Sequence, residues 1–192
     1  MKEVEIKQLA SDVAAILGES LALDCSPEES PFPDLQLRVR ILAPEALNKL
    51  IWDTPLCRLS DAKAFQGTVK RDENGDGKLE LPEDFFRLVS VRMSDWKYPV
   101  TEIAESGQTE IQSSRWPGVK GNPERPAVTL EMVAPGKRVM HLYSSDADAT
   151  LSSFLYIPRP EVSAAGILSL PSDLYSPLVV WLANYFSGLI RE

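Results

Sequence analysis

The sequence has little of the chemistry that most enzyme active sites need. Its 192 residues include one histidine, His141, and two cysteines, Cys25 and Cys57, neither of which lies in a Cys-x-x-Cys motif. A zinc site needs more His and Cys ligands than this. There is also no glycine-rich phosphate loop and no Gly-x-Ser-x-Gly motif. Only Cys57 with His141 could serve as a nucleophile and its base in a hydrolase, and no local signature accompanies them. We expect no enzymatic activity, no catalytic residue and no cofactor.

Long basic runs and long apolar runs are absent too. The formal net charge is -8, and no run of Lys or Arg exceeds two residues. A duplex-binding surface needs a basic patch, so we expect no sequence-specific nucleic-acid binding. No apolar run approaches the ~20 residues that span a bilayer, and the first residues, MKEVE, contain no apolar signal core. We therefore expect synthesis in the cytoplasm, reduced thiols and no membrane partner.

The apolar pattern changes twice along the chain. Residues 6–17 and 35–51 show helical spacing, with Pro44 interrupting the second segment, and helical spacing returns after Pro177. Between them, short alternating segments separated by Gly and Pro indicate strands. The predicted strands are Leu88–Met93, Val100–Ala104, Ala127–Val133, Arg138–Tyr143 and Leu151–Ile157. The fold class predicted is α+β: N-terminal helices and a C-terminal helix packed with a central, mostly antiparallel β-rich region. We predict a single domain, 1–192, with a helical part (1–60 and 172–192) and a β-rich part (65–170).

One acidic segment fits a calcium loop. Asp72, Asn74, Asp76 and Glu83 occupy positions 1, 3, 5 and 12 of an EF-hand loop, and Gly77 occupies position 6, where the chain turns sharply. A hard cation prefers such carboxylate and amide oxygens. These residues are the candidate calcium ligands, and they make a small calcium-binding interaction module the alternative function.

The same segment also fits a β-hairpin without a metal. An EF-hand needs a helix on each side of its loop, whereas residues 64–71 contain a Gly and a Thr-Val pair that favour a strand. In this interpretation residues 66–70 and 78–81 are strands, and Asn74-Gly75-Asp76-Gly77 is the turn between them. We favour the hairpin and predict no metal site.

The residues after this segment resemble a module of tailed-bacteriophage structural proteins. The sequence LPEDFFRLVSVRMSDWKYPV, residues 81–100, resembles a pattern in which L-P-x-D-F leads into a strand and then into W-x-x-P-V. Residues 112–116 (QSSRW) and 121–126 (GNPERP) are similar to later parts of the pattern. The element order is similar to that of head–tail connector (adaptor) proteins: N-terminal helices, a β-rich part opened by L-P-x-D, and a C-terminal helix near a second L-P, here Leu170-Pro171-Ser172-Asp173. The resemblance covers about residues 35–185.

This resemblance implies a phage or prophage virion structural protein, made in the bacterial cytoplasm and assembled into the virion. It implies a head–tail connector ring subunit whose partners are the portal and tail proteins and further copies of itself. Such a subunit needs no active site, and a net negative chain suits a conduit that repels the phosphates of DNA.

Overall fold

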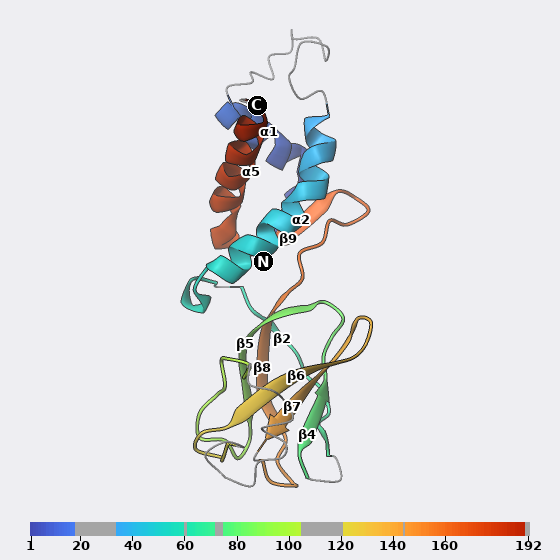
Figure 1. The fold of residues 1–192 in the computed structure, drawn as a ribbon, viewed down its shortest axis with the longest axis vertical. Helices are drawn as coiled ribbons and strands as arrows, with labels where there is room; N and C mark the ends of the chain where they lie inside the picture. The colour runs from blue at the N-terminus through green and yellow to red at the C-terminus, as the bar shows by residue number, and fades with distance from the viewer. Residues whose placement is uncertain (18–33, 60, 72–74, 105–120, 144, 191–192) are drawn as a thin grey trace. The chain divides into compact units, whose positions relative to one another are not determined.

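The structure is a computed structural model that describes residues 1–17, 34–59, 61–71, 75–104, 121–143 and 145–190 (Figure 1). Its contacts form two compact units: unit 1 is Met1–Asp61 with Pro160–Glu192, and unit 2 is Ala62–Arg159. The sequence predicted one domain, with a helical and a β-rich part that meet near residues 60–65 and 170–172. The first boundary lies there, whereas the second lies earlier, at Pro160, because residues 167–170 pair with the N-terminal strand of unit 1.

Unit 1 combines helices with one small antiparallel sheet. Its elements are β1 (Lys2–Glu5), α1 (Ile6–Leu17), α2 (Leu35–Asp53), the 3-10 turn η1 (Leu56–Arg58), β9 (Ile167–Leu170), the 3-10 turn η2 (Ser172–Leu174) and α5 (Tyr175–Ile190). β1 pairs with β9 in antiparallel register, with Val4 opposite Leu168. The helices α1, α2 and α5 all contact one another (Figure 1).

The helices form where apolar side chains recur every three or four residues. In α1, the buried residues Ile6, Leu9 and Val13 lie on one face. α2 runs through Pro44, which lacks an N–H and so removes one helical hydrogen bond. α2 ends at Asp53. The next residue, Thr54, has an extended backbone, because Pro55 disfavours a helical conformation for the residue before it.

Unit 2 consists of two antiparallel sheets. Its strands are β2 (Lys63–Ala64), β3 (Lys70–Arg71), β4 (Gly77–Glu80), β5 (Phe85–Met93), β6 (Ala127–Ala134), β7 (Lys137–Tyr143) and β8 (Leu151–Pro158). One sheet has the order β2-β8-β5 and the other the order β3-β4-β7-β6. The predicted turn at residues 134–137 joins β6 to β7, and Gly136 there has φ +78.

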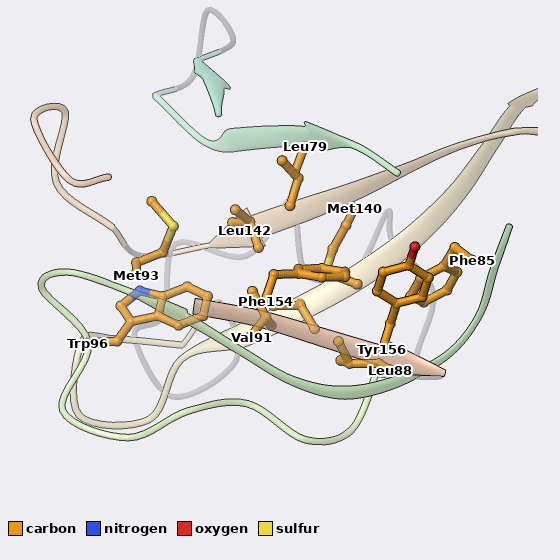
Figure 2. Close-up of a cluster of buried hydrophobic side chains, with 11 residues drawn as sticks. Leu79, Phe85, Leu88, Val91, Met93, Trp96, Met140, Leu142, Phe154 and Tyr156 are labelled. Atoms are coloured by element: carbon orange, nitrogen blue, oxygen red, sulfur yellow. The ribbon is translucent and has the colours of Figure 1, made fainter. Parts of the chain in front are cut away.

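The core of unit 2 lies between its two sheets. Figure 2 shows Leu79, Met140 and Leu142 of one sheet pointing toward Phe154 and Tyr156 of the other. These side chains are at most 1% exposed. Alternate residues, Met140 and Leu142 of β7 and Phe154 and Tyr156 of β8, supply this inner face, because successive strand residues point to opposite sides.

The predicted α+β class is confirmed, since helices occupy the N- and C-terminal segments and every strand pair in the described residues is antiparallel. The strand predicted at Val100–Ala104 is wrong. Only Val100 forms a bridge, to Val91, and the rest of that segment leaves the edge of β5. Conversely, β1 was not predicted, because only Val4 of its four residues is buried.

Candidate functional site

The acidic segment that fits a calcium loop forms part of an antiparallel hairpin. β3 pairs with β4, with Lys70 opposite Lys78, as the hairpin interpretation predicts. Asp72 and Asn74 lie outside the described residues. Asp76 is 5% exposed and immediately precedes β4, whereas Glu83 is exposed and follows it. β4 is a strand of four residues. A strand of that length spans roughly 13 Å, which places the backbones of Asp76 and Glu83 at opposite ends of an extended segment.

Gly77 has a different role from the turn glycine of a calcium loop. Among the described glycines of this segment, the positive φ belongs to Gly75, at +83, and Gly77 is the first residue of β4. A Cβ on Gly77 would lie 2.9 Å from the Cγ1 of Val69 and 3.3 Å from the Cβ of Leu142. The glycine is therefore required by close packing inside the sheet rather than by a turn around an ion.

The guanidinium of Arg71 binds carbonyl groups next to this hairpin. It donates hydrogen bonds to the carbonyl oxygens of Gly75 (3.3 Å), Ser145 (3.2 Å), Asp146 and Ala149 (3.2 Å), and to the Ser145 hydroxyl (2.6 Å). A fixed positive charge thus contacts the carbonyl of Gly75. It opposes the binding of a second cation at the same place, because like charges repel. Within the described residues, no three His, Cys, Asp or Glu side chains come together as a metal-binding group.

The first L-P-x-D motif anchors the start of β5. The Phe85 N–H donates to the Pro82 carbonyl (3.0 Å), which closes a turn. The Asp84 carboxylate accepts hydrogen bonds from the Lys63 ammonium (2.7 Å) and the Tyr156 hydroxyl (2.7 Å). Burial alone would raise the pKa of Asp84, but the hydrogen bonds from Lys63 and Tyr156 outweigh burial and hold the pKa below its ordinary value. Asp84 therefore ties β5 to both β2 and β8.

The second L-P-x-D motif makes a similar turn at the start of α5. The Leu174 N–H donates to the Pro171 carbonyl (3.0 Å). In this motif the fixed carboxylate comes from elsewhere: Asp61 accepts hydrogen bonds from the Ser172 N–H (2.8 Å) and the Ser172 hydroxyl (2.9 Å). These two bonds lower the pKa of Asp61. Both motifs thus place a proline turn, fixed to a carboxylate, where a new element begins.

His141 and Cys57 belong to different units. His141 lies in β7, as predicted, and is 1% exposed. Its Nε2 is 2.8 Å from a carboxylate oxygen of Glu131, and its buried Nδ1 has no hydrogen-bond partner in the described part of the chain. Cys57 is exposed in η1, within unit 1.

A cleft of about 410 Å³ lies within unit 1. It is lined by residues 5–7, Gln36, Arg40 and residues 164–167. Charges of both signs line it, so the cleft does not select one class of ligand by charge.

Sequence reasoning did not find Lys63, Arg71 or Tyr156. Their partners lie between 4 and 78 residues away in the sequence, so no local spacing marks them. None of the helices in the described ranges is both long enough and apolar enough to cross a bilayer. No protein-family model and no curated protein sequence matches the chain.

Proposed function

We propose that this protein is a structural subunit of a tailed-phage or prophage particle, a head–tail connector (adaptor) ring component without enzymatic activity. Its proposed partners are the portal and tail proteins and further copies of itself, and its proposed location is the virion. The observation that carries the proposal is the placement of the two L-P-x-D turns. One opens the strand β5 and the other opens the helix α5, and each is closed by the same proline-carbonyl hydrogen bond of 3.0 Å.

The order of elements also supports this proposal. The helices α1 and α2 come before the β-rich part, the first motif opens β5 within that part, and the second motif opens the C-terminal helix α5, an order similar to that of the family in the resemblance. The carboxylates of Asp84 and Asp61 accept hydrogen bonds that hold elements in place at the two motifs. This suits a part whose function is mechanical.

The first test is composition and assembly of the particle. Portal, capsid and tail genes should neighbour the gene, and mass spectrometry of purified particles should detect the chain at a stoichiometric level. Disrupting the gene should leave DNA-filled heads that fail to join tails. Infectious, tailed particles assembled without the chain would contradict the proposal, as would a gene neighbourhood of carbohydrate or signalling enzymes.

Two adjacent residues give a matched pair for complementation of the disrupted gene. Asp84→Ala removes the carboxylate that binds Lys63 and Tyr156, and we expect a strong loss of tailed particles. Glu83→Ala changes an exposed neighbour and should complement fully. A calcium module predicts the opposite order, because Glu83 would be its bidentate ligand.

A further inference from the structure

We draw no further inference here: the strongest candidate, the exposed apolar patch at the tip of the β6–β7 hairpin, where Met132 is 69% exposed and Val133 is 62% exposed, carries none because nothing in the described part of the structure shows what covers it.

Discussion

Replacing Arg71 by Lys should destabilise unit 2 although the charge is conserved. The planar guanidinium of Arg71 reaches four carbonyl oxygens and a hydroxyl, on both sides of the gap between the hairpin and residues 145–149. A lysine ammonium has three donors at a single point and cannot span these acceptors. The bonds to the Ser145 and Ala149 carbonyls are partly buried, so losing them leaves acceptors with little access to water.

The magnitude follows from these two partly buried bonds. A hydrogen bond to a charged group contributes about 1.5–3 kcal/mol, and partial exposure together with one bond recovered by Lys reduces the total to about 2 kcal/mol. For a unit of this size, that loss lowers the melting temperature by about 10 °C. Residues 145–149 lose the hydrogen bonds from Arg71, so amide exchange should become faster there first. The remaining bond from the Asp146 N–H to the Asp95 carboxylate (2.8 Å) holds this segment only at one point.

Urea denaturation measures the loss of stability. Hydrogen exchange read by mass spectrometry locates it, in peptides from β4 and residues 145–150. Lys70→Gln is the control. The adjacent Lys70 makes an ion pair with Glu80 that is exposed on both sides, 69% and 72%, and such pairs add little to stability. If Arg71→Lys matches the wild type in both measurements, the bridging role of the guanidinium is refuted.

Four further outcomes follow from the structure. The lowered pKa of Asp84 means that its contribution to stability is present above the pKa of the unfolded chain, about 4, and is lost as pH falls through the folded value; Asp84→Asn should flatten the acid limb of stability against pH, and an unchanged acid limb would contradict it. Burial, followed by the hydrogen bond to Asp12, raises the pKa of Tyr175 to about 12. Its contribution is thus complete below pH ~10 and lost between ~10 and ~12, so ultraviolet titration should find Tyr175 in the late-ionising tyrosine phase, together with Tyr156, whose pKa is also raised by burial, and Tyr175→Phe should reduce that phase. Gly77→Ala should cost about 1–3 kcal/mol, because its Cβ would meet Val69 and Leu142, and a stable variant would show that the sheet relaxes there. Calorimetry of calcium into chelator-treated protein should give no micromolar binding; saturable heat that Asp76→Ala abolishes would restore the calcium module.

The sequence predicted the elements whose signals are local. α1 and α2 follow from apolar side chains at helical spacing, and their observed bounds, Ile6–Leu17 and Leu35–Asp53, lie close to the predicted ones. The hairpin β6–β7 follows from alternation on both sides of a Pro-Gly turn. In each case the residues that determine the structure lie within a few positions of one another.

What the sequence could not predict depends on distant partners. β1 exists because β9 pairs with it, and the two are separated by most of the chain. The same pairing moves the boundary between the units from near Leu170 to Pro160. At the candidate site, the acidic pattern at residues 72–83 was visible, but its role depends on Arg71 and on the packing of Gly77 against Leu142. Both contacts join residues far apart in the sequence, so no local motif could have predicted them.

The insertion of unit 2 into unit 1 sets an order for folding during synthesis. Among these elements α5 is synthesised after unit 2. The helices α1 and α2 therefore cannot pack against α5 until unit 2 has been made. Unit 2 can fold first, because all its strands are continuous in sequence between Ala62 and Arg159. The pairing of Lys63 with Tyr156 then brings together the two ends of unit 2, where the chain enters it from unit 1 and returns to unit 1. This pairing replaces a flexible loop of nearly one hundred residues with a short closure, and it lowers the entropic cost of docking α5 onto α1 and α2. A destabilised unit 2 should therefore slow the assembly of unit 1 even where no side chain of unit 1 has changed.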